Sequence, residues 1–345
     1  MNNPLENYNP NDIAVDNGNF MGLPFTYETA KLIIISVPWE ATVSYHQGTA
    51  QAPQQILDAS LQIDLFDFDY PDGWQQGIFL KGYAQEMLES NEYYREQATK
   101  VIENLAIGIK VENSQDLRDS IFIVNHGSKL LNEYVFKHCE TALNLGKKIA
   151  VIGGDHSVPL GCFQALSSKY NDFGILHIDA HADLRNAYEG FEFSHASIMF
   201  NAMKIPQITK LVQVGLRDIC HEEVQMINES NNRIIAYYDA QIKQQLYAGK
   251  SWLEQCQEIV SNLPEKVYIS FDVDGLDPKL CPHTGTPVPG GLELEQVYCL
   301  FREVVKSGRE IIGFDVCEVG DDEWDANVGA RITYKLANFL HLSTY

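Results

Sequence analysis

The chain has 345 residues, of which 45% are hydrophobic, and it carries 47 acidic against 25 basic side chains. This apolar content supplies a large core and excludes an intrinsically disordered chain. The formal net charge of -22 argues against a nucleic-acid partner, because binding phosphates requires Lys and Arg to replace counterions. An acidic protein is better suited to cationic ligands and metal ions.

The N-terminal residues 1–7 contain neither the basic stretch nor the apolar run of a secretory signal. The apolar run at 32–35 is far too short to span a bilayer. Seven cysteines are scattered without CxxC spacing, which favours buried thiols in a reducing compartment. We therefore expect a cytoplasmic protein that does not contact a membrane.

An opening segment rich in Asn, Pro and Gly predicts an N-terminal surface arm over 1–30. After it, short apolar runs rich in β-branched residues alternate with helix-like stretches. These runs lack polar alternation, as strands buried on both faces do. We expect strands at 31–37, 148–152, 174–178, 210–214, 233–236, 266–271 and 310–316.

Helical patterns lie between these strands, at 86–106, 127–145, 160–169, 251–262, 293–306 and 328–340. The alternation predicts a three-layer α/β/α fold with a mostly parallel central sheet. Region 64–125 carries only helical and loop signals, so we interpret it as an insertion or a pair of covering helices. No internal repeat or linker divides the chain, and we take 1–345 as a single domain.

The strongest functional signal is Asp-Ala-His-Ala-Asp at 179–183, directly after an expected buried strand. In extended backbone, the spacing of two places Asp179, His181 and Asp183 on one side. Such crowded ionisable groups repel one another unless a metal ion neutralises them. Helix capping or pairing with Lys is the competing explanation, and few basic residues lie nearby. We place His177 on the opposite face of the strand, as a core residue with satisfied hydrogen bonds.

Two further strand ends carry polar side chains. Asp272 and Asp274 follow the strand expected at 266–271 and share one face, although turns also use Asp freely. His156 follows the strand expected at 148–152, after paired glycines that allow a tight turn. In open α/β sheets, ligands bind at the carboxyl ends of the strands.

Together these edges offer two histidines and four aspartates, which is too many carboxylates for one structural zinc site. The set suits two divalent ions that share Asp oxygens. Oxygen ligands with a little imidazole favour manganese, with zinc, cobalt or nickel as substitutes. Two such ions supply a hydroxide nucleophile at neutral pH.

The three motifs resemble the signatures of the ureohydrolase superfamily, which comprises arginases, agmatinases and formimidoylglutamases. They are Gly-Gly-Asp-His-Ser at 153–157, Asp-Ala-His-Ala-Asp at 179–183 and Ser-Phe-Asp-Val-Asp-Gly-Leu-Asp-Pro at 270–278. Their order and spacing match, and the similarity extends from about Ile33 to the C-terminus. The resemblance implies a dimanganese hydrolase of guanidino or formimino carbon, and an assembly of trimers or hexamers.

The resemblance also implies a role for each matching residue. One manganese would be held by His156 and Asp183, the other by His181 and Asp274, and both would be bridged by Asp179 and Asp272.

Two further residues match functional positions of the family. The segment Ser194 to Ser197 resembles the one with the proton-shuttling histidine, here His195, whose alternative is a surface position at a loop end. Glu318 resembles the guanidinium-binding glutamate, because a carboxylate can pair with two N–H donors of a planar guanidinium.

The substrate follows less directly from the residues. Arg185 stands where arginases have an asparagine, and the run from Asp183 to Gly190 is more similar to agmatinases. We therefore predict a small cationic guanidino substrate, agmatine first, with Glu189 offsetting the charge of Arg185. Trp39 departs from the agmatinase pattern and either closes over a small substrate or packs in the core.

Several alternatives stay open. Within the family, the chain could be an arginase, a guanidine hydrolase or a formimidoylglutamase. A mononuclear zinc amide hydrolase of the deacetylase type has a related sheet, although a complete second ligand set counts against it. The non-enzymatic alternative is a structural protein that binds divalent metal without releasing urea.

Overall fold

The computed structural model describes residues 4–344 and contains an eight-stranded sheet in which all neighbouring strands are parallel. The strand order is β2-β1-β3-β8-β7-β4-β5-β6. All the expected strands are present near their expected bounds: β1 (Leu32–Val37), β3 (Lys148–Gly153), β4 (Phe173–Ile178), β5 (Ile208–Leu216), β6 (Ile234–Tyr238), β7 (Lys266–Asp272) and β8 (Glu310–Cys317). The predicted parallel α/β sheet is confirmed.

The sheet contains one strand that the sequence patterns did not indicate. β2 (Ile78–Lys81) pairs with β1 at the sheet edge, within the region expected to hold only helices and loops. That expectation is wrong for these residues. Ile78 and Leu80 are buried and alternate with half-buried neighbours, but four residues are too short for this period to stand out.

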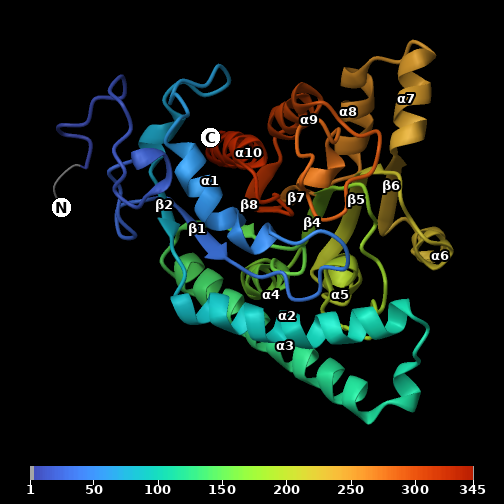
Figure 1. The fold of residues 1–345 in the computed structure, drawn as a ribbon. Coiled ribbons are helices and arrows are strands. Elements are labelled where there is room, and N and C mark those ends of the chain that lie inside the picture. The colour runs from blue at the N-terminus through green and yellow to red at the C-terminus, as the bar shows by residue number, and fades with distance from the viewer. Residues whose placement is uncertain (1–3, 345) are drawn as a thin grey trace.

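Helices cover both faces of the sheet, and Figure 1 shows α8, α9 and α10 on one side with α3, α4 and α5 on the other. The long helices are α2 (Gln85–Ala106), α3 (Gln115–Asn144), α4 (Leu160–Lys169), α8 (Trp252–Ser261), α9 (Leu294–Lys306) and α10 (Glu323–Leu342). The shorter ones are α1 (Ala52–Ser60), α5 (Ile198–Ala202), α6 (His221–Glu229) and α7 (Asp239–Tyr247). None of the helices within residues 4–344 is long and apolar enough to cross a membrane.

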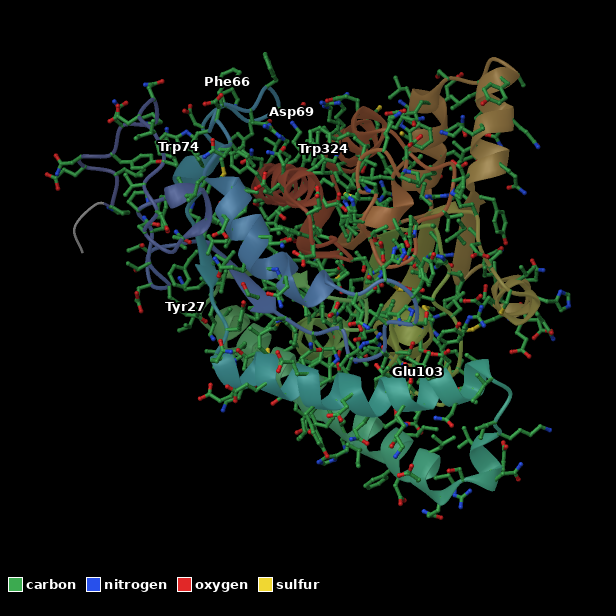
Figure 2. All side chains as sticks on the ribbon, in the orientation of Figure 1. Tyr27, Phe66, Asp69, Trp74, Glu103 and Trp324 are labelled. Carbon is green, nitrogen blue, oxygen red and sulfur yellow. The ribbon has the colours of Figure 1, made fainter. Side chains whose placement is uncertain are left out.

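α3 begins well before the expected position 127. Ser114 caps it, since its side chain accepts a hydrogen bond from the backbone of Leu117. α2 and α3 pack against each other as an antiparallel hairpin outside the sheet (Figure 1), and their outer surface is covered by charged side chains such as Glu103 (Figure 2). A small apolar cluster lies between them, formed by Ala98, Val101, Leu117, Val124 and Phe191.

The segment expected as a surface arm is exposed at Ile13 but buried at Phe20 and Leu23. The Asn19 side-chain amide holds this segment in place, because the amide donates hydrogen bonds to the carbonyls of Leu23 and Ile78. The N-terminal segment is thereby attached to the edge strand β2.

The sheet topology brings the polar motifs together. β3, β8, β7 and β4 are consecutive neighbours in the sheet. Their last residues are in register, since Val316 pairs with both Ile152 and Phe271, and Phe271 also pairs with Ile178. Because all four strands are parallel, the residues that follow them meet at one edge, where ligands bind in such sheets.

Candidate metal centre

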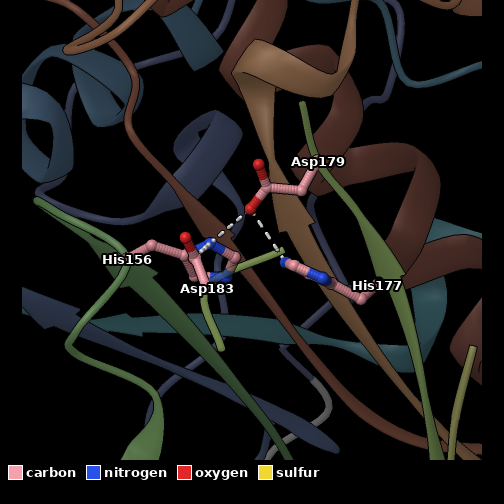
Figure 3. A group of neighbouring side chains, drawn as sticks. All are labelled: His156, His177, Asp179 and Asp183. Carbon is pink, nitrogen blue, oxygen red and sulfur yellow. Dashed lines mark hydrogen bonds and ion pairs between the residues drawn. The ribbon is translucent and has the colours of Figure 1, made fainter. Parts of the chain in front are cut away.

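His156 lies at the centre of the cluster formed at this edge. Its Nδ1 is 3.1 Å from Asp179 Oδ2, 3.3 Å from Asp183 Oδ2 and 3.2 Å from Asp272 Oδ2. Figure 3 shows His156 meeting Asp179 and Asp183, which come from the segment after β4. The three sequence motifs therefore meet at a single point, as expected.

His181 forms the second half of the cluster. Its Nδ1 is 2.9 Å from Asp274 Oδ2 and 3.5 Å from Asp179 Oδ1. Asp179 thus faces His156 with one oxygen and His181 with the other, as a carboxylate placed between two metal positions would. All six expected ligand residues are adjacent, and His181 is the most accessible of them, with 24% of its side chain exposed.

Backbone N–H groups orient the carboxylates. Asp272 Oδ1 accepts a hydrogen bond from the backbone of Asp274 at 2.8 Å, and Asp274 Oδ1 accepts one from Ala180 at 3.0 Å. Asp179 Oδ1 accepts one from the backbone of His181 at 2.6 Å. The other oxygen of each carboxylate then points toward the imidazoles, so the loops prearrange the donor atoms.

The cluster has more negative charge than the protein itself compensates. Within the described residues, no Lys or Arg lies within 4.0 Å of these carboxylates. Burial and the charge of Asp179 raise the pKa of Asp183 to about 7, and burial and the charge of Asp274 raise the pKa of Asp272 well above its usual value. Both pKa shifts show that the cluster favours additional positive charge.

Divalent metal ions fit this donor set. Buried carboxylate oxygens with two imidazoles are suitable ligands for such ions, whose charge would replace the protons. The donor atoms of His156, His177, Asp179 and Asp183 all lie within 4.8 Å of one another, as do those of Asp179, His181 and Asp274.

His177 has a role that the sequence analysis missed. Its Nε2 lies 2.8 Å from Asp179 Oδ2 (Figure 3), so its assignment to the opposite strand face is wrong. Residues two apart in a strand share a face, which was the signal that could have found it. The amide nitrogen of Gln213 donates to the Ala182 carbonyl at 2.8 Å and to His177 Nδ1 at 2.9 Å. The proton of a neutral His177 ring must then be on Nε2, the atom that lies beside Asp179 Oδ2.

Glu318 reaches the same site from the end of β8, with a left-handed backbone φ of 63°. Its Oε1 accepts a hydrogen bond from the backbone of His156 at 2.9 Å, whereas Oε2 is buried and has no partner. Burial and the charge of Asp155 raise the pKa of the Glu318 carboxyl well above its usual value. Glu318 therefore presents an oxygen that is available to a cationic ligand.

A cavity of about 230 Å³ joins these groups, and both Glu318 and His195 line it. The backbone N–H of His195 donates to Thr42 Oγ1 at 3.3 Å, and its Nδ1 lies 3.5 Å from the same oxygen. Burial and the charge of His181 lower the pKa of His195 to about 3, so its ring is neutral near pH 7. The predicted shuttle residue is thus inside the site rather than at a surface loop end.

At the cavity mouth, Arg185 and Glu189 do not form the expected pair. The Arg185 guanidinium lies 4.8 Å from the centre of the Tyr188 ring, and no carboxylate of the described residues lies within 4.0 Å of it. Burial raises the pKa of the Glu189 carboxyl, and the charge that opposes this increase is that of Arg95. The expectation that Glu189 offsets Arg185 is therefore wrong.

Trp39 is 2% exposed and its ring packs 5.5 Å from that of Tyr94. Of its two predicted roles, the structure supports core packing. The burial leaves Tyr45, rather than Trp39, as the aromatic side chain of the β1–α1 loop that lines the cavity.

Comparison with protein families matches residues 30–338 to the model of the arginase family. The chain belongs to the arginase family. Members of this family depend on two metal ions, and the buried His and Asp groups described above are compatible with such a centre.

Individual relatives place the chain among the agmatinase-like ureohydrolases. It is 30% identical to an N(1)-aminopropylagmatine ureohydrolase of Thermus thermophilus, over 85% of this chain and 84% of that protein. It is 25% identical to an agmatinase of Bacillus anthracis, over 85% of both proteins. The chain is therefore an arginase-family enzyme of the ureohydrolase type.

Solved structures show the same fold. The proclavaminate amidino hydrolase of Streptomyces clavuligerus superposes with a TM-score of 0.71 at 20% identity, over 96% of this chain and 99% of that chain. The agmatine ureohydrolase of Thermoplasma volcanium gives a TM-score of 0.68 at 21% identity, over 92% of both chains. These likenesses confirm the three-layer α/β/α architecture.

Proposed function

We propose that this enzyme hydrolyses the guanidino C–N bond of a small cationic substrate and releases urea, with agmatine as the preferred compound. The observation that carries the proposal is the free, buried Oε2 of Glu318 in the same cavity as the His and Asp cluster. This oxygen supports guanidinium binding, because a carboxylate pairs well with planar N–H donors. The agmatinase and aminopropylagmatine ureohydrolase relatives support the choice of substrate.

In this proposal, the cluster holds two divalent ions. His156 and Asp183 would hold one ion, His181 and Asp274 would hold the other, and Asp179 and Asp272 would serve both. We propose manganese, with nickel, cobalt and zinc as alternatives, because oxygen donors predominate. When bound, such ions lower the pKa of water enough to supply hydroxide at neutral pH.

Glu318 would orient the substrate. Its Oε1 is fixed by the His156 backbone, so the side chain is prearranged before a ligand arrives. A guanidinium provides the cationic partner that the buried Glu318 Oε2 lacks. Orientation of this kind places the guanidino carbon against the cluster.

His195 would move a proton during the reaction. Its Nδ1 lies beside the hydroxyls of Thr42 and Ser194, at 3.5 and 3.4 Å, which leaves Nε2 for exchange. A neutral imidazole can accept a proton from solvent and donate it to the departing amine.

The far end of the substrate would lie at the cavity mouth, near Arg185, Tyr45 and Asp218. A cavity of about 230 Å³ is small among ligand sites, which favours a short substrate. Asp218, whose side chain is 71% exposed, offers a negative charge to an amine tail, whereas Arg185 opposes it.

Urea release tests the proposal directly, with manganese-activated enzyme and a panel of agmatine, N(1)-aminopropylagmatine, arginine, guanidinobutyrate, guanidine and formiminoglutamate. We expect kcat/KM for agmatine to exceed that for arginine. A ratio below one overturns the substrate, and turnover of guanidine alone moves the protein to the guanidine hydrolases. Metal binding without urea release from any compound would contradict the function.

We further propose a cytoplasmic location. All seven cysteines are free thiols, and five of them are buried: Cys139, Cys162, Cys256, Cys281 and Cys317. Free thiols are typical of a reducing compartment. Fractionation of the cells of origin, with detection by antibody, would test this location.

A further inference from the structure

The α2–α3 hairpin contributes none of the proposed ligands, yet it contacts two loops that border the site. The first, residues 38–48, follows β1, and the second, residues 184–195, follows the β4 motif. Figure 1 shows α2 running beside the blue segment that contains the first loop. The sequence analysis assigned no function to this region.

One face of α2 holds the 38–48 loop. Arg95 Nη1 donates to the carbonyls of Ala41, at 3.3 Å, and Val43. One turn earlier, the Asn91 side chain accepts a hydrogen bond from the backbone of Glu40 at 2.7 Å. Arg95 therefore fixes the backbone on both sides of Thr42.

α3 holds the 184–195 loop in a similar way. The Asn125 amide donates to the Gly190 carbonyl at 3.2 Å and accepts from the backbone of Glu192 at 2.8 Å. Phe191 between them is fully buried in the apolar cluster of the hairpin. The two helices thus determine where both loops lie.

The two loops meet at Thr42 and His195. Thr42 Oγ1 accepts the backbone N–H of His195 at 3.3 Å and lies 3.5 Å from its Nδ1. The same hydroxyl is 3.4 Å from Asp155 Oδ2, to which it donates. Any displacement of the Thr42 backbone would therefore change the position of the His195 ring in the site.

We propose that Arg95 is a positioning residue for His195. Arg95 acts indirectly: it holds the backbone on both sides of Thr42, and Thr42 contacts His195. The proposal rests on the proposed function only for the role of His195 as a proton shuttle. The charge of Arg95 also opposes the increase that burial causes in the pKa of Glu189, on the second loop.

Three variants test this role. Arg95→Met retains the apolar stem and removes the donors, and Arg95→Lys restores a cationic donor. Arg118→Met is the matched control, because Arg118 donates to the carbonyls of Val111 and Glu112 at the exposed end of the hairpin. We expect Arg95→Met to lower kcat by about ten- to a hundredfold, as displaced catalytic groups do, with KM and metal content unchanged. Arg95→Lys should recover part of kcat, and Arg118→Met should behave as wild type.

A double-mutant cycle with His195→Asn decides whether the effect acts through His195. We expect Arg95→Met to cause no further loss of kcat in the His195→Asn background. A full, multiplicative loss there would overturn the proposal, as would an unchanged kcat in a folded Arg95→Met protein.

A readout without turnover separates this inference from the proposed function. The rate of His195 modification by diethyl pyrocarbonate, followed by peptide mass spectrometry, should change in Arg95→Met and not in Arg118→Met. An unchanged rate in Arg95→Met would overturn the positioning role. If wild-type enzyme released no urea from any guanidino compound, the function would fail while this measurement still tested Arg95.

Discussion

Two clusters of buried charge in this molecule differ in how they are neutralised. One is the candidate metal centre, and the other, here called the α10 ion cluster, consists of Asp67, Asp69, Arg302 and Lys335. In the latter, Lys335 Nζ is 2.7 Å from Asp67 Oδ2 and 2.5 Å from Asp69 Oδ2, and Arg302 Nε is 2.7 Å from Asp69 Oδ1. Asp69 lies on the segment between α1 and β2 (Figure 2), which these ion pairs attach to α9 and α10.

The α10 ion cluster pairs its two acids with two bases, and Arg302 also contacts the exposed Glu295 at 3.4 Å. The metal centre instead gathers carboxylates without Lys or Arg within reach among the described residues. The pKa directions reflect the contrast. Burial raises the pKa of Asp69, but Arg302 and Lys335 outweigh it and leave a lowered value, whereas the pKa values of Asp183 and Asp272 stay raised. A balanced cluster supports the fold, and an unbalanced one requires a cation from outside.

The largest effect is expected for Asp179→Ala. Asp179 faces His156 with one oxygen and His181 with the other, so its loss should remove both metal ions and reduce urea release to background. The measurements are elemental analysis and a urea assay on the same preparation. Retention of one metal equivalent would contradict the bridging position of Asp179.

Glu318→Gln keeps the shape of the side chain but removes the charge that the guanidinium requires. We expect substrate binding to weaken by about 2–5 kcal/mol, the usual effect of breaking a buried charge pair. Metal content should not change. A wild-type KM in this variant would remove Glu318 from substrate binding.

Lys335→Met breaks the balance of the α10 ion cluster. Asp67 would lose its basic partner, whereas Asp69 would keep Arg302. We expect the free energy of unfolding to fall by about 3 kcal/mol, near the lower limit for buried pairs. The control is Lys279→Met, in the exposed pair with Glu293, for which the loss should be much smaller because solvent screens exposed charges. Denaturant melts would measure both, and the metal stoichiometry of Lys335→Met should match that of wild type.

The pH dependence of Lys335→Met follows from Asp69. The folded-state pKa of Asp69 is below its unfolded value, so its contribution to stability is complete above the unfolded pKa. That contribution disappears as the pH falls through the folded pKa. The stability difference between wild type and Lys335→Met should therefore shrink in acid, and a constant difference would exclude an electrostatic origin.

His195→Asn should lower kcat by a factor on the order of 10², the usual size of a lost general acid–base group. Because His195 is not among the proposed ligands, metal content should stay at the wild-type level. Steady-state kinetics with agmatine provide the test, and unchanged kinetics would remove His195 from the mechanism.

The smallest effect is expected for His177→Leu, which removes the contact of the imidazole Nε2 with Asp179 Oδ2. Metal affinity should fall by about 10- to 100-fold, as is typical for residues that orient a ligand. His177→Gln can still donate a hydrogen bond and should recover part of this affinity. Calorimetric metal titrations of both variants would distinguish the orienting role from simple core packing, which predicts equal losses.

The sequence predicted much of the fold because parallel strands buried on both faces leave continuous apolar runs. The strand β2 and the first part of α3 escaped detection, since a four-residue edge strand and a helix with an exposed first half give weak patterns. The ligand positions were predictable because His156, Asp179 and Asp272 each follow a buried strand, and neighbouring parallel strands end at one edge.

Contacts between distant loops could not be predicted from local patterns. The influence of the Arg95 charge on Glu189 depends on α2 lying beside the site, which no local signal indicates. Glu189 also has a left-handed backbone, with φ of 54°, which the sequence pattern did not indicate. The position of the hairpin, and with it the role inferred for Arg95, became visible only in the folded chain.

The metal content of purified, active enzyme tests the central claim most directly, that the unbalanced cluster is completed by cations. Elemental analysis should give two divalent ions per chain in wild type, two in Lys335→Met and none in Asp179→Ala. A single tightly bound zinc ion per chain, with full urea-releasing activity, would contradict it.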